Sequence, residues 1–267
     1  MLTGAKKLYR FLILNIKCNL LSALEYKKSF IIQALFMFIN NFFFLIFWLV
    51  VFKNNNGNIE GVTMNDIMYL WASPTLAYGI AYFIFGGVSD LGKYLIEGTL
   101  DSFLLQPKNI ILNVATSQGK FSAFGDLIYG LIIGLIAVNG DILRYIVLIL
   151  LGIFCSIFYI CTEAIIRLLT VWIGNTDNIE NVYICSLLIT FSTYPEKIYN
   201  SFVKTLIYTI VPSAYIAFVP IRYTLTFDVK ELFILFVAAS IYIALTTIIC
   251  KKALIKYESG NSMGLRG

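Results

Sequence analysis

The chain has 267 residues, of which 59% are hydrophobic and only 13% are charged, and its formal net charge is +5. Soluble domains carry about 25% charged residues, so this composition excludes an ordinary soluble globular protein. Apolar runs of about twenty residues recur without strict polar alternation, and each is long enough to cross a bilayer core of about 30 Å as a helix. The sequence therefore predicts an all-α, polytopic membrane protein, with residues 1–267 forming a single domain.

The first expected element covers residues 5–27. Apolar side chains follow helical spacing along one side of it. Four cations lie on the other side: Lys6, Lys7, Arg10 and Lys17. We expect an amphipathic helix that lies in the cytoplasmic interface with its cations near anionic headgroups. A plain cytosolic helix is the alternative.

About six transmembrane helices are expected after this interfacial helix. Their expected ranges are 29–52, 67–88, 121–138, 143–172, 182–194 and 231–250. Pro74 lies in the second range and should kink that helix or delay its start. The turn residues Asn139, Gly140 and Asp141 predict that the third and fourth spans are antiparallel neighbours.

A broken element is expected before the last span. The apolar run that starts near residue 182 stops at Tyr194 and Pro195, and Pro212 and Pro220 interrupt the next one. Irregular backbone at membrane depth is tolerated only where protein or water covers it. We therefore expect a broken or re-entrant element over residues 195–220.

The distribution of cations predicts the orientation. In a six-span arrangement most of them fall on one side: Lys6, Lys7, Arg10, Lys17, Lys27, Lys28, Lys93, Lys108, Lys120, Lys251, Lys252, Lys256 and Arg266. The richer side is cytoplasmic by the positive-inside rule, so both termini and residues 90–120 should be cytoplasmic. The abundance of Ile, Asn, Lys, Phe and Tyr indicates an AT-rich bacterial genome and hence the bacterial cytoplasmic membrane.

Motifs of catalytic chemistry are missing from the sequence. Histidine is absent, which removes the commonest general base and metal ligand. The sequence has neither a phosphate-binding Gly-x-x-x-x-Gly-Lys-Ser/Thr loop nor a Gly-x-Ser-x-Gly elbow. The five cysteines include no Cys-x-x-Cys pair. We therefore expect no enzyme activity, no metal site and no nucleotide site in this chain.

Three ionisable residues lie inside the expected spans. Glu163 and Arg167 are four residues apart and share one face of the fourth span. Charges within a membrane usually pair or line a transport path, and both interpretations stay open for this pair. Asp126, in the third span, faces either the cytoplasmic mouth or a partner helix.

Between the second and third spans lies the polar strip, residues 90–120. Its centre, from Glu97 to Pro107, combines a glycine, a carboxylate and an apolar face formed by Leu100, Phe103 and Leu104. We expect a short amphipathic helix across the cytoplasmic mouth that docks a soluble partner. An ordinary interfacial helix is the alternative.

The same segment resembles a family signature. Gly98-Thr99-Leu100-Asp101, followed by Leu104-Leu105 and Pro107, is similar to the pattern G-T-L-D-x-x-L-L-x-P in the cytoplasmic loop of ABC-2-type permeases. The resemblance implies a six-span subunit encoded with a separate ATPase, which this loop contacts. It also implies non-catalytic coupling positions at Glu97, Gly98, Thr99, Leu100, Asp101, Leu104, Leu105 and Pro107. Gln106 departs from the family, in which a basic residue is frequent at this position.

The resemblance thus implies the membrane subunit of an ATP-driven exporter. ATP and magnesium would bind the partner ATPase subunits, and this chain would hold no cofactor. A second permease, either identical or homologous, and membrane lipids are the other expected partners, while nucleic acid is not expected. The alternatives are an ATP-independent carrier or channel and a lipid-modifying enzyme. The apolar spans carry no mark of the substrate.

Overall fold

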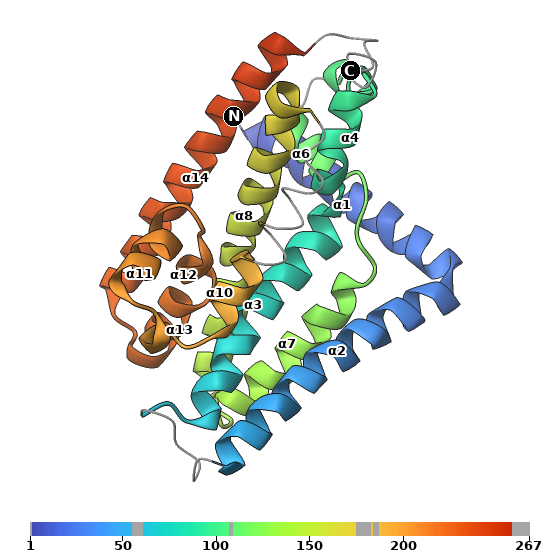
Figure 1. The fold of residues 1–267 in the computed structure, drawn as a ribbon. Coiled ribbons are helices and arrows are strands. Elements are labelled where there is room, and N and C mark those ends of the chain that lie inside the picture. The colour runs from blue at the N-terminus through green and yellow to red at the C-terminus, as the bar shows by residue number, and fades with distance from the viewer. Residues whose placement is uncertain (1, 55–60, 107–108, 175–182, 184–186, 258–267) are drawn as a thin grey trace.

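The structure, a computed structural model, describes residues 2–54, 61–106, 109–174, 183 and 187–257. The secondary-structure elements of these residues are all helices, which confirms the all-α prediction (Figure 1). Four are long and apolar enough to cross a membrane: α2 (Lys27–Asn54), the α3-to-α4 segment Met64–Ile96, α8 (Ile142–Ile173) and α14 (Val229–Lys256). A bent pair raises the number to five if it forms one span. The number of six therefore stays a prediction.

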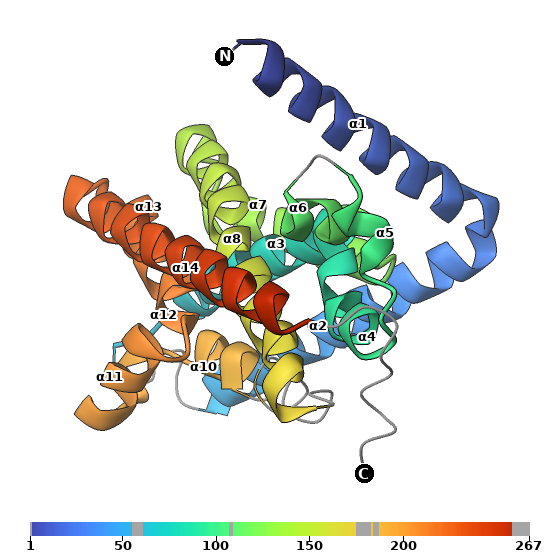
Figure 2. The ribbon, with the colours of Figure 1, turned by 90° about the horizontal axis from the view of Figure 1, so that it is seen from above.

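Helix α1 (Leu2–Glu25) corresponds to the amphipathic helix expected over residues 5–27. In the view from above it extends along the edge of the molecule (Figure 2). The side-chain amides of Asn15 and Asn19 donate hydrogen bonds to the Thr116 hydroxyl and carbonyl oxygens, at 2.9 and 3.2 Å. Thr116 directly follows α6 (Ile110–Ala115), so α1 is fastened to the polar strip. Its location in the membrane interface remains a prediction.

Helix α3 (Met64–Phe85) lies at the centre of the bundle. Thr63 and Asp66 form a capping box at its first turn, and the helix continues through Pro74. The expectation that Pro74 delays the helix start was therefore wrong. The Thr63 hydroxyl accepts a hydrogen bond from the Asp66 N–H, and this capping box starts the helix well before the proline.

The short helix α7 (Ala123–Ala137) lies against α3. A Cβ atom on Gly130 would lie 2.8 Å from the Leu76 backbone nitrogen, and one on Gly152 of α8 would lie 3.0 Å from the Leu76 Cβ. Helix α3 therefore packs against both α7 and α8. The predicted antiparallel contact of the third and fourth spans occurs near their turn, where Gly134 meets Leu148. With 15 residues, α7 is about 22 Å long, shorter than the span expected over 121–138.

The segment before the last span is broken into short helices. They are α10 (Ile189–Thr193), η3 (Glu196–Ile198), α11 (Ser201–Thr209), α12 (Ser213–Ile216) and α13 (Phe218–Thr226). The stretch Ser213–Thr226 is bent by 72° from α11, which agrees with the predicted break. Much of the span expected over 182–194 lies outside the described residues, and its described part forms only the five-residue α10. Whether this segment re-enters the membrane stays a prediction.

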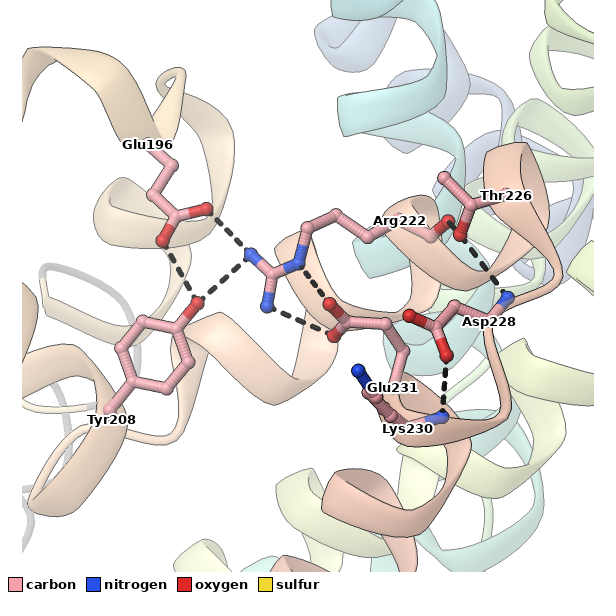
Figure 3. A network of polar contacts seen from close by, with 7 residues as sticks. All are labelled: Glu196, Tyr208, Arg222, Thr226, Asp228, Lys230 and Glu231. Carbon is pink, nitrogen blue, oxygen red and sulfur yellow. Dashed lines mark hydrogen bonds and ion pairs between the residues drawn. The ribbon is translucent and has the colours of Figure 1, made fainter.

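Arg222 joins these short helices to the start of α14 (Figure 3). Its Nε and Nη2 atoms donate to the two carboxylate oxygens of Glu231, at 2.9 and 3.1 Å. Its Nη1 donates to Glu196 at 2.7 Å and to the Tyr208 hydroxyl at 3.0 Å. The Tyr208 hydroxyl in turn donates to Glu196 at 2.9 Å. One guanidinium thus connects η3, α11, α13 and α14.

Candidate functional site

The polar strip is closed at its base against the end of α3. The Gly87 N–H donates to the Gln118 carbonyl at 2.7 Å, and the Lys120 N–H donates to the Tyr82 carbonyl at 2.9 Å. A Cβ atom on Gly87 would lie only 2.2 Å from the Val114 carbonyl oxygen. Glycine is therefore needed here so that the two ends of the strip can meet.

The centre of the strip bends at Gly98. Helix α4 (Leu91–Ile96) ends there, and Gly98 has a left-handed φ of 69°. The Thr99 N–H donates to the Tyr94 carbonyl at 3.0 Å, which is the hydrogen bond of a Schellman helix end. The next helix, α5 (Asp101–Leu104), has a single turn. The short helix in the centre of the strip is therefore the single turn α5, which begins after the glycine ends α4 and redirects the chain.

The bend separates the leucines of the signature into buried and exposed positions. Leu100 is 1% exposed, whereas Leu104 is 38% and Leu105 is 87% exposed. Phe103 is half-buried, with its ring 5.1 Å from that of Tyr94. Leu100, Phe103 and Leu104 therefore do not form the single apolar face that the sequence predicts. Only its first two members point inward, and the exposed apolar tip consists of Leu104 and Leu105.

The other signature residues occupy the rim of this tip. Glu97 is exposed, with a carboxylate oxygen 4.0 Å from the Lys93 ammonium, and Thr99 is also exposed. Asp101 is half-buried beside Tyr257, which follows the last turn of α14. Burial raises the pKa of the Tyr257 hydroxyl, and the charge of Asp101 raises it further. Pro107 lies outside the described residues.

Leu100 belongs to a cluster that joins the strip to two long helices. It packs with the strip residues Leu91, Leu95 and Val114, with Leu168 and Val171 of α8, and with Cys250 and Ala253 of α14. Two of the longest apolar helices therefore end on the buried side of the strip. Leu100 thus connects the exposed tip to side chains that pack closely against both helices.

Glu163 and Arg167 form a buried ion pair next to the strip. Glu163 is fully buried and Arg167 is 8% exposed, with 3.3 Å between the Arg167 Nε and Glu163 Oε1 atoms. The Tyr82 hydroxyl donates to the other Glu163 oxygen at 2.7 Å. A Cβ atom on Gly92 would lie 3.2 Å from the Arg167 Cδ. The pair thus lies where α8, α3 and α4 meet, and this geometry favours the structural interpretation over a transport path.

Asp126 faces α2, which is the partner-helix alternative of the sequence interpretation. It is 3% exposed, and its Oδ1 accepts a hydrogen bond of 2.6 Å from the Asn41 amide. The same amide donates to the Met37 carbonyl at 3.1 Å. Sequence reasoning missed Asn41. A polar side chain in the middle of an apolar run would have been the signal.

The fold and the site together indicate the class of protein to which this chain belongs. A bundle of helices apolar and long enough to cross a membrane, with a polar strip packed at one end, is a polytopic integral membrane protein. The family model described as ABC-2 family transporter protein matches residues 11–261, so the chain belongs to the ABC-2 transporter family. This family consists of membrane components of transporters, which generally lack an ATPase site of their own. Comparisons with curated proteins and with solved structures gave no match.

Proposed function

We propose that this chain is the permease subunit of an ATP-driven exporter and that the polar strip couples it to separate ATPase subunits. The observation that carries this proposal is the two-sided arrangement of the strip. Leu105 presents an apolar side chain to the outside, while Leu100, five residues earlier, packs against α8 and α14. An exposed apolar tip on a firmly packed base is suited to receive a partner and to pass on its movement.

The coupling runs from the ATPase through the strip to the long helices. ATP and magnesium bind the partner subunits, which close on one another. This closure pushes the tip at Leu104 and Leu105. The Leu100 cluster passes the push to the ends of α8 and α14, which tilt. This chain contributes substrate binding and motion, and the ATPase contributes the chemistry.

The proposal includes an orientation of the chain in the membrane. The strip and both termini face the cytoplasm of a bacterium, since the excess of cations lies on that side. Lys251, Lys252 and Lys256 lie in the last turns of α14, close to the Leu100 cluster. Two permease chains, identical or homologous, enclose the transport path between them in the membrane.

Coexpression with the ATPase encoded beside it tests the proposal. The wild-type chain should copurify with the ATPase and support ATP-dependent transport in proteoliposomes. Asp101→Lys reverses a charge on the rim, and Gly98→Pro imposes a backbone angle that Gly98 does not have. Both variants should abolish ATP-dependent transport. Lys53→Asp, a charge reversal in the last turn of α2 and outside the strip, should preserve it.

Two results would contradict this proposal. The first is that no ATPase copurifies and that both strip variants transport normally. The second is transport by the chain alone in liposomes without ATP, which would establish the ATP-independent carrier or channel instead.

A further inference from the structure

A crevice of about 860 Å³ lies among the helices on the side of the molecule where α1 runs. Its walls come from α1, α3, α7, α8 and α14, and residues of the polar strip also line it. Ligand pockets in proteins have volumes of about 300–1,000 Å³, so the crevice is large enough for a substantial molecule. Because three of the helices that form its walls, α3, α8 and α14, are membrane-spanning candidates, the molecules that reach it first are those of the bilayer.

The lining of the crevice offers almost no hydrogen-bonding capacity. Most of the lining side chains are aliphatic, and the polar ones include Asn109, whose Oδ1 accepts a hydrogen bond from the Leu112 N–H, and the hydroxyl residues Ser156, Thr246 and Thr247. Each hydroxyl donates to a backbone carbonyl three or four residues earlier in its own helix, at 2.6 to 2.8 Å. A sugar or a peptide would leave polar groups without partners in such a space, at a considerable cost. An alkyl chain has no such groups and fits this lining.

Helix α1 adds a charged border to the apolar space. Leu12 and Ile16 of α1 line the crevice, whereas Lys6, Arg10 and Lys17 of the same helix are exposed. One helix therefore presents aliphatic side chains to the cavity and cations to its surroundings. The molecule that matches both is amphiphilic, with an apolar tail and an anionic head. In the proposed orientation α1 lies at the cytoplasmic leaflet, where anionic lipids are concentrated.

We propose that the crevice binds an acyl chain of an anionic phospholipid from the cytoplasmic leaflet, with the lipid headgroup beside the cations of α1. This inference goes beyond the permease role, since the lipid binds the chain whether or not an ATPase is attached. The bound chain fills the space between α1 and the α3–α8–α14 bundle. The lipid thus becomes part of the wall that α1 forms on this side.

Photolabelling of the purified full-length chain in nanodiscs tests the proposal. The probe is phosphatidylglycerol with a diazirine in one acyl chain, and phosphatidylcholine with the same labelled chain is the comparison. Labelling by phosphatidylglycerol should saturate, should exceed that by phosphatidylcholine several-fold, and should map to crevice residues of α8 and α14. Unlabelled phosphatidylglycerol should compete for it.

Matched variants separate the crevice from the general lipid surface. Ile153→Trp fills the crevice from α8, and Leu150→Trp places the same ring on an exposed position of the same helix outside it. The first should lose most of the specific labelling and the second should retain it. Thr247→Trp fills the crevice from α14 and should repeat the loss, which guards against a folding defect of a single variant.

Charge reversals test the proposed position of the lipid headgroup beside the cations of α1. Lys17→Glu should lower the preference for phosphatidylglycerol over phosphatidylcholine, while Lys53→Glu, at the far end of α2, should not. Unchanged labelling of both crevice variants, or equal labelling by the two lipids, would overturn the proposal. Crosslinks from crevice residues to a second copy of the chain would also overturn it, because a protein would then occupy the space. Absence of specific phosphatidylglycerol labelling of the wild-type chain, together with normal ATPase copurification, would refute this inference alone.

Discussion

Leu105 provides the sharpest perturbation of the proposed coupling. It is 87% exposed, so Leu105→Ala removes almost no packing from the chain itself. Exposed substitutions usually change the free energy of unfolding by less than about 0.5 kcal/mol. If the ATPase covers this side chain, the truncation removes three buried carbon atoms at about 0.8 kcal/mol each, or about 2.4 kcal/mol of binding free energy. That corresponds to about a fiftyfold increase in the Kd of the permease–ATPase complex.

Titration of nanodisc-embedded permease with the purified ATPase measures this Kd, and thermal unfolding of the same samples provides the control. Leu105→Ala should weaken the complex with an unchanged Tm. Leu100→Ala should instead lower the Tm. Leu100 is 1% exposed, and a buried Leu→Ala substitution costs about 2–5 kcal/mol of stability. A Kd for Leu105→Ala equal to that of the wild type would refute the docking role of the tip.

Three further predictions concern the supports of the site. Gly98→Ala forces a side chain into a left-handed conformation and should cost about 1–2 kcal/mol of stability in equilibrium unfolding, and a cost near zero would contradict the bend. Glu163→Ala leaves Arg167 buried without its carboxylate and should cost about 3–5 kcal/mol of stability. The double variant Glu163→Leu with Arg167→Leu should recover most of this loss. A single variant with unchanged stability would argue against a structural pair. Arg222→Ala removes the connection between the short helices and α14, so hydrogen exchange should accelerate over residues 196–231, and unchanged exchange would contradict that connection.

The long apolar helices were predictable because their cause is local. A run of about twenty apolar residues must satisfy its backbone internally, so α2, α8 and α14 appear close to their predicted ranges. The all-helical class and the family signature follow from the same kind of information. The exact ends depend on caps such as Asp228, whose side chain accepts a hydrogen bond from the Lys230 N–H at the start of α14.

The arrangement of side chains at the strip could not be predicted in the same way. The signature contains three leucines, and nothing in their spacing states that Leu100 packs on α8 and α14 while Leu105 points outward. That difference results from the left-handed turn at Gly98 and from contacts with residues far along the chain. The Asn41–Asp126 hydrogen bond was hidden for the same reason, since its partners are 85 residues apart.

Site-specific photocrosslinking from the strip tests the central claim most directly. A benzophenone amino acid replaces Leu105 in one strain and Ile142, which is also exposed and lies at the start of α8, in another. Each chain is coexpressed with the ATPase. The coupling account predicts a crosslink to the ATPase from position 105 that changes in yield when ATP is bound, and none from position 142. Absence of the crosslink from position 105, or crosslinks of equal yield from both positions, would contradict it.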